Sequence, residues 1–376
     1  MPRCWLRVLH GLLIAAWWLC ASAGVAETPP PTHPASADSD EPDTTPEVAA
    51  ARTVVRLFGD IDWRSRSDSE PNTFVLGQID VFLTSELAPN LSVLAETVLE
   101  SPKDGTSQIA DVERFQLQYS PADAFTVSVG RMHTMLGFWN QAYHHGTWLQ
   151  TTAFRPDVYL FEDEEGGGLL PVHEVGVRLS GAASMTALRF EYAASVVNGR
   201  AADPSQVATF QDENGAKAVH LWAGLSPRSL PHLQVGGCAV VDTIPPSPGV
   251  GRTDSLDERI WGGFLVFQGP RLELLTEAFS ILHRDNATGV DWKSNGLYAQ
   301  VAWAIGRWKP YYRYDHLDRD EADPYYAATL QDVDRHTLGL RVDPWSRVAL
   351  KFEASRARVA GGSAFNAAAV QAAFTF

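Results

Sequence analysis

Beyond residue 51, the chain repeats short segments in which apolar and polar side chains alternate. In 90–100, Val93 and Leu99 fall on one face, and Glu96 and Glu100 fall on the other. A period of two residues predicts β-strands, here with one apolar and one partly charged face. No apolar stretch after residue 51 reaches the roughly 18 residues that a membrane-spanning helix needs. We therefore predict an all-β fold.

Sixteen segments carry this pattern. They are 52–64, 73–87, 90–100, 109–119, 124–132, 172–181, 184–197, 217–226, 231–242, 256–268, 270–283, 291–305, 307–317, 332–343, 346–357 and 364–376. Tight connections, such as those at 88–90, 181–184 and 343–346, alternate with longer ones. An even number of strands joined alternately by short turns and long loops is typical of a transmembrane antiparallel up-and-down β-barrel. In such a barrel both termini lie on the short-turn, periplasmic side, and closure leaves no unpaired strand edge in lipid.

The amino-terminal segment predicts export. Arg3 and Arg7 precede an apolar run over 8–19, and small residues follow it, which is the pattern of a cleaved signal peptide over residues 1–26. Residues 27–51 are rich in Pro, Thr, Ser and acidic side chains and predict a disordered periplasmic tether. The barrel then takes residues 52–376.

Composition excludes several functions. Loss of Arg3 and Arg7 with the leader changes the formal charge from −15 to −17, which argues against nucleic-acid binding. The chain has no GxSxG elbow and no convincing Ser-His-Asp spacing, so we expect no enzyme and no cofactor.

The longest irregular segment is 133–171, between the fifth and sixth predicted strands. Its aromatic side chains, Trp139, Tyr143, Trp148 and Phe154, predict that it packs against something, with the barrel interior as the nearest candidate. It also carries an acidic cluster, either in the lumen or mouth of the barrel or at a solvated loop tip. That cluster is Glu162, Asp163, Glu164 and Glu165.

The alternation also assigns charges to the inner face. The inner face of the thirteenth to fifteenth predicted strands is mainly basic, with two acidic residues, Asp315 and Glu353. Its basic residues are Lys309, Arg313, Arg335, Arg341, Arg347 and Lys351. The acidic residues on the inner face of the second and third strands are Asp80, Glu86, Glu96 and Glu100. A positive wall facing a negative wall sets a transverse field across a narrow pore. Basic residues near a constriction would favour anions.

The last segment ends in alternating apolar positions with Phe374 and Phe376. It resembles the carboxy-terminal signal that the barrel-assembly machinery reads in outer-membrane barrels. The chain also resembles general porins in the position of its longest loop, and the stretch GFWNQAYHHG is similar to one in barrels grouped loosely with phosphate-selective porins. The resemblance implies an integral protein of a Gram-negative outer membrane, in contact with lipid and assembled as a homotrimer. It also implies a channel for small hydrophilic solutes or ions, narrowed by 133–171.

Two other interpretations stay open on the sequence alone. The barrel would be structural, adhesive or partner-sheathing if its lumen were plugged. His144 and His145, with His133 and His173, suggest a metal site, but adjacent histidines do not converge on one ion without help from elsewhere. We therefore expect no metal.

Overall fold

The computed structural model describes residues 52–376 apart from 101–108, 145, 162–163, 165 and 207–210. The predicted signal peptide and tether lie outside the described residues. The strands are β1 (Thr53–Arg66), β2 (Ser69–Ala88), β3 (Leu91–Glu100), β4 (Ile109–Ala122), β5 (Phe125–His133), β6 (His173–Ser184), β7 (Leu188–Asn198), β8 (Lys217–Pro227), β9 (Leu233–Ile244), β10 (Leu256–Gln268), β11 (Leu272–Asp285), β12 (Asp291–Trp303), β13 (Trp308–Asp318), β14 (Val333–Trp345), β15 (Val348–Val359) and β16 (Phe365–Thr375). Short helical turns are α2 (Trp139–Ala142), η1 (Asp157–Tyr159) and η2 (Pro248–Val250).

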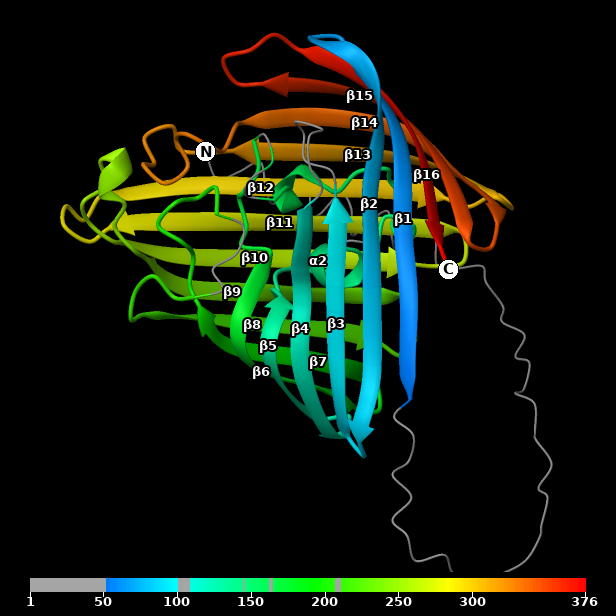
Figure 1. Ribbon diagram of the computed structural model, residues 1–376, viewed down its shortest axis with the longest axis horizontal. Helices are drawn as coiled ribbons and strands as arrows, with labels where there is room; N and C mark the ends of the chain where they lie inside the picture. Colours follow the sequence, from blue (N-terminus) through cyan, green and yellow to red (C-terminus); the bar gives the residue numbers. More distant parts are fainter. Residues whose placement is uncertain (1–51, 101–108, 145, 162–163, 165, 207–210) are drawn as a thin grey trace, which may run out of the picture. The chain divides into compact units, whose positions relative to one another are not determined.

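These strands form one closed antiparallel barrel in which each strand pairs with its neighbours in the chain (Figure 1). The barrel closes where β1 pairs with β16, from Phe58 opposite Thr375 to Arg66 opposite Ala367. Leu57 and Phe376 then exchange two backbone hydrogen bonds of 2.9 and 3.0 Å. The predicted sixteen-stranded barrel is therefore confirmed.

One predicted turn was wrong. We expected a turn at 181–184, but β6 runs on to Ser184 and the chain reverses at 185–187. Gly181 had suggested a turn, yet it pairs with Tyr192 inside the sheet. A Cβ on Gly181 would lie 2.2 Å from the carbonyl oxygen of Ala124, so a close backbone approach explains this glycine.

The alternation of faces follows the predicted pattern. On β15, Lys351 is fully buried on the inner face and Phe352 is 42% exposed on the outer face. On β3, Glu96 is 3% exposed and Leu99 is 38% exposed. Large apolar side chains are thus exposed on the outside and charged ones are enclosed, the reverse of a water-soluble sheet and the arrangement that lipid favours.

Connections at the two ends of the barrel differ in length. The turns at the end that carries the start of β1 and the end of β16 are 89–90, 123–124, 185–187, 228–232, 269–271, 304–307 and 346–347. The opposite end, which we call the loop end, carries longer connections at 134–172, 199–216, 245–255 and 319–332. No helix in the described part of the chain combines the length and the apolar character needed to cross a membrane.

Candidate functional site

The connection between β5 and β6, residues 134–172, is called the inner loop, because its described residues lie inside the barrel. Its bounds differ by one residue from the predicted 133–171. Leu136, Trp139 and Tyr159 are at most 2% exposed, and α2 is seen within the barrel in Figure 1. The predicted packing of this segment against the interior is therefore confirmed.

One side of the inner loop packs on the apolar inner face of β8 to β12. Trp139 stacks on Tyr159 with ring centroids 5.5 Å apart, and Tyr159 meets Phe279 of β11 edge-on at 5.8 Å. The indole of Trp222 on β8 donates a 2.9 Å hydrogen bond to the carbonyl of Gly137. These contacts belong to a continuous core of aromatic and aliphatic side chains, so this half of the lumen is filled.

Glu277 on β11 holds the start of the inner loop. It is 1% exposed and accepts hydrogen bonds from the backbone N–H groups of Phe138 and Trp139 at 2.7 and 2.9 Å. The hydroxyls of Tyr159 and Tyr298 also donate to it, each at 2.7 Å. Burial, followed by the charge of Glu277, raises the pKa of Tyr159, which keeps this phenol a donor.

The middle of the inner loop binds the basic wall. Arg313 on β13 donates to Thr152 Oγ1, to the Phe154 carbonyl and to the Arg155 carbonyl at 2.8–3.1 Å. Lys351 on β15 donates to the carbonyls of Thr147 and Thr152. Both cations are at most 2% exposed and are therefore covered by the loop.

Three more of the predicted basic residues contact the same stretch. Arg341 donates to the carbonyls of Trp148 and Gln150, each at 2.8 Å. Arg335 pairs with Asp157 at 2.8 Å, and Lys309 donates to Thr151 and Glu273. The structure thus brings five of the six predicted basic residues together around one segment of loop.

Arg347 is the sixth, and it lies elsewhere. It is exposed in the tight turn between β14 and β15, at the end of the barrel remote from the loop end. In the acidic cluster, Glu164 accepts a hydrogen bond from the backbone N–H of Phe161 at 2.7 Å. Glu162, Asp163 and Glu165 lie outside the described residues.

The acidic and basic walls are not opposite each other. Asp80 and Glu96 are buried on the inner faces of β2 and β3, as predicted. However, the strand order around the barrel separates β2 from β15 by only β1 and β16. The two charged sectors are therefore neighbours along the wall, because a closed up-and-down barrel places the first and last strands side by side.

Two inward arginines were missed in the sequence. Arg64 on β1 pairs with Asp62, lies over the ring of Phe154 at 4.8 Å and has a side chain 47% exposed. Arg114 on β4 pairs with Glu96 and is 21% exposed. Arg64 follows the same alternation as Asp60 and Asp62, so its inward position was available in the pattern.

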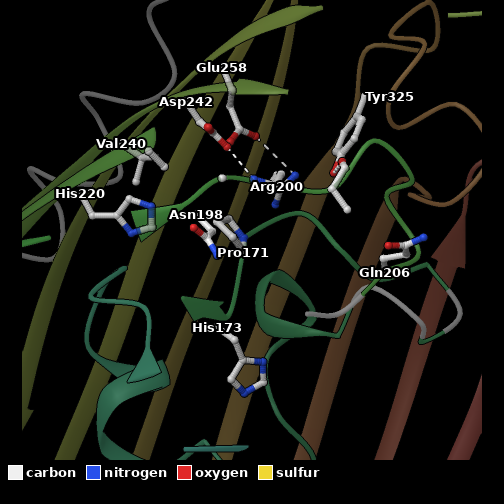
Figure 2. Close-up of a pocket in the computed structure, with 13 residues that line it drawn as sticks. Pro171, His173, Asn198, Arg200, Gln206, His220, Val240, Asp242, Glu258 and Tyr325 are labelled. Atoms are coloured by element: carbon white, nitrogen blue, oxygen red, sulfur yellow. Dashed lines mark hydrogen bonds and ion pairs between the residues drawn. The ribbon is translucent and has the colours of Figure 1, made fainter. Parts of the chain in front are cut away.

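A second polar network lies under the connections of the loop end. Arg200, just after β7, donates its backbone N–H to Asp242 of β9 at 2.7 Å and pairs with Glu258 of β10 at 3.4 Å (Figure 2). Its guanidinium also donates to the hydroxyl of Tyr326 and to the carbonyl of Leu169. A cavity of about 30 Å³ lies here, lined by Arg200, Asp242 and Glu258 and by His173 and His220. Polar walls and this size suit a bound water or small ion.

Comparison with known proteins places the fold among the porins. No protein-family model and no curated protein matches the sequence. Among solved structures, an anion-selective porin from Comamonas acidovorans matches with a TM-score of 0.61, 12% identity and coverage of 87% of this chain and 100% of that one. The outer-membrane channel DcaP of Acinetobacter baumannii matches with a TM-score of 0.58 and 11% identity, and the match covers 87% of this chain and 98% of that one. OmpF of Salmonella typhi, in complex with daunomycin, matches with a TM-score of 0.57 and 11% identity, and the match covers 87% of this chain and 97% of that one. At this identity the likeness is one of fold.

Proposed function

We propose that this protein is a porin-like channel of a Gram-negative outer membrane, through which small hydrophilic solutes or ions diffuse passively. The apolar outer surface supports an integral membrane position, and the fold shared with porins supports a channel. We propose further that its termini are periplasmic and that it is not an enzyme.

The observation that carries the proposal is the anchoring of the inner loop to the wall. The loop is held on one side by Glu277 and on the other by Arg313 and Lys351, so it crosses the lumen at a fixed position. A loop with buried hydrogen bonds at both sides keeps one conformation, since each bond lost would leave a buried polar group unsatisfied. A loop that keeps one conformation narrows the pore to a constant width, whereas a mobile loop would block it intermittently.

The solute path that fits these contacts runs beside β1 to β4. Arg64 and Arg114 keep exposed guanidinium surface there, whereas their carboxylate partners Asp62 and Glu96 are almost fully covered. A passing solute can therefore contact the guanidinium groups directly, whereas the covered carboxylates are out of its reach. We therefore propose a preference for anions.

Single-channel recording of the refolded protein in planar bilayers tests this function. We expect discrete conductance steps and, in a salt gradient, a reversal potential of the sign that marks anion selectivity. Pure folded protein that gives no conductance would exclude the channel.

A second candidate is a barrel whose lumen is plugged, with a structural, adhesive or partner-sheathing role. One observation favours it: Arg313 and Lys351 are covered by the inner loop and offer no charge to a passing solute. Liposome swelling separates the two. Vesicles containing the protein would swell in small sugars if it is a channel and would stay unchanged if it is a plug.

A further inference from the structure

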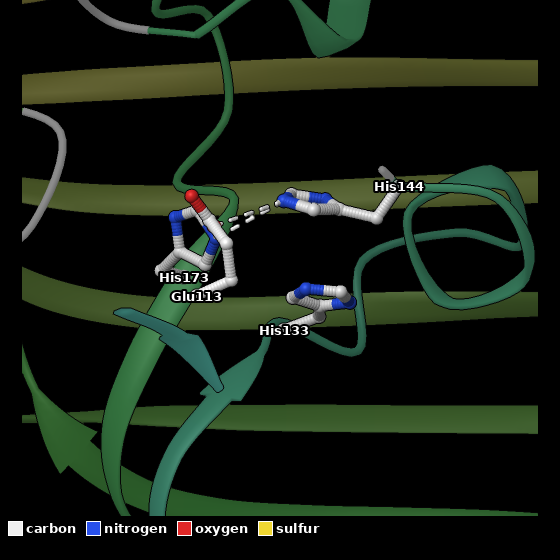
Figure 3. Close-up of side chains that lie close together, drawn as sticks. All are labelled: Glu113, His133, His144 and His173. Atoms are coloured by element: carbon white, nitrogen blue, oxygen red, sulfur yellow. Dashed lines mark hydrogen bonds and ion pairs between the residues drawn. The ribbon is translucent and has the colours of Figure 1, made fainter. Parts of the chain in front are cut away.

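Four metal-ligating side chains meet where the inner loop leaves and rejoins the wall. Glu113 comes from β4, His133 ends β5, His144 follows α2 in the inner loop and His173 begins β6 (Figure 3). One ligand atom of each lies within 4.8 Å of all the others. The sequence drew attention to the three histidines but predicted neither their convergence nor the part of Glu113, because both depend on three strands and a loop that return to one place.

The distances within the cluster approach those of a coordination sphere. Nε2 of His173 lies 2.5 Å from Oε2 of Glu113 and 3.0 Å from Nε2 of His144. Nε2 of His144 lies 3.7 Å from the same oxygen. Ligands held about 2.0–2.1 Å from a tetrahedral Zn²⁺ are separated by roughly 3.3 Å, so only small shifts would admit an ion.

A supporting residue sets the tautomer of His144. Asn140 donates its amide N–H groups to the carbonyls of Thr134 and Val172 at 3.2 and 2.9 Å, which fixes the orientation of the amide. Its Oδ1 then accepts from Nδ1 of His144 at 2.6 Å. Because Nδ1 carries the proton, Nε2 presents a lone pair toward Glu113 and His173. An outer hydrogen bond of this kind orients most metal-binding histidines.

The backbone also presents the other ligands. In the pairing of β3 with β4, Glu96 lies opposite Arg114 and Thr97 lies opposite Val112, which makes Glu113 the extra residue of a β-bulge. Bulges often aim a side chain at a site. His133 and His173 are direct cross-strand partners, and the ring of His133 packs on His144 with centroids 3.7 Å apart. Glu96 brings a second carboxylate to within 3.6 Å of His133 Nε2.

We propose that Glu113, His133, His144 and His173 bind one divalent transition-metal ion, with Zn²⁺ as the preferred species. Three imidazoles and one carboxylate form a donor set that suits Zn²⁺, and His173 also lines the polar cavity beside the cluster. The ion joins the inner loop to β4, β5 and β6. This proposal holds whether or not the barrel conducts.

Metal titration of the tag-free, EDTA-treated folded protein tests the site. Calorimetry with Zn²⁺ is expected to give one ion per chain, and Co²⁺ is expected to give the visible absorption bands of a tetrahedral centre. Binding weakens as the pH falls, because protons compete with the metal for imidazole nitrogen. A folded wild-type protein that binds no stoichiometric ion would leave only a hydrogen-bonded Glu-His pair and overturn the proposal.

Two sets of variants locate the ion. His144→Gln with His173→Gln is expected to abolish stoichiometric binding, whereas His316→Gln with His336→Gln is expected to leave it unchanged. The control histidines bond to Asp334 and Tyr312, away from the cluster. Asn140→Ala should weaken binding by about 10–100-fold through loss of orientation alone. Equal binding by the His144/His173 double variant would contradict the site, and the wild-type titration remains decisive if that variant does not fold.

Discussion

Lys351 shows how single side chains decide whether the inner loop stays in place. Its ammonium group is fully buried and donates to the carbonyls of Thr147 and Thr152. A long basic side chain with a buried head is costly unless every donor is used. Here the loop carbonyls supply the acceptors, so the charge serves to anchor the backbone.

Replacement of Lys351 by methionine should loosen the inner loop without opening the barrel. Methionine keeps the length of the side chain but leaves two buried carbonyls unsatisfied, at about 1–3 kcal/mol each. We expect faster chymotryptic cleavage within 134–172 and a noisier or larger conductance, with the heat-dependent gel mobility of the barrel unchanged. Lys293→Met, at an exposed position of β12, is the control. Identical cleavage rates in both variants would contradict an anchoring role.

Arg64 is the residue at which charge should govern selectivity. Its side chain is 47% exposed, while its partner Asp62 is covered. Arg64→Glu is therefore expected to shift the reversal potential toward cations. Arg313→Glu should lower stability instead, because that charge is enclosed. Arg66→Glu serves as control, since Arg66 lies at the end of β1 and pairs with Asp68. A reversal potential that moves equally for Arg64 and Arg66 would rule out Arg64 as a local determinant.

Among the elements, the inner loop differs most from an ordinary connection. One of its sides lies on the apolar core, and the other donates and accepts hydrogen bonds along β13 to β15. The sequence indicated the first property through its aromatic residues. It gave no sign of the second, because backbone groups carry no side-chain signature and pair according to the position of the loop.

Removal of the part of the loop that binds the basic wall should widen the lumen. We expect that replacement of residues 147–157 by a short Gly-Ser linker increases the single-channel conductance and exposes Arg313 and Lys351 to solvent. Replacement of 286–288, in the connection between β11 and β12, is the control at the same end of the barrel. If conductance is unchanged by loss of 147–157, this stretch does not narrow the path.

The outer wall of the whole molecule holds one feature relevant to assembly. A shallow groove of about 620 Å³ runs over β13 to β16 and β1, lined mainly by small and apolar groups that include Leu338, Ala354 and Ala368. Small side chains on an outer wall permit close contact between subunits. The groove is consistent with the homotrimer that the resemblance to porins implies. The homotrimer stays a prediction.

Bulk placed in this groove should separate the subunits. Ala368→Trp is expected to convert an oligomer seen in unheated gels, and in light scattering of the detergent-solubilised protein, into monomer. Val301→Trp, on the exposed outer face of β12, should leave the assembly intact. A wild-type protein that is monomeric from the start would refute the trimer.

The sequence by itself determined the barrel. Alternation with a period of two fixed the strands and their faces, since a slip of one residue would turn charges such as Glu96 and Lys351 toward lipid. Alternating connection lengths fixed the topology, and the surplus of aromatic residues indicated that 133–171 packs inside.

Only the tertiary structure decided what the enclosed residues contact. Closure placed the acidic sector of β2 and β3 beside the basic sector, and the path of the inner loop determined which cations it covers and which stay exposed. The same path brought His144 to His133 and His173, and a bulge turned Glu113 toward them. Such contacts join residues far apart in the chain, and no local pattern encodes them because they depend on where a long loop returns in space.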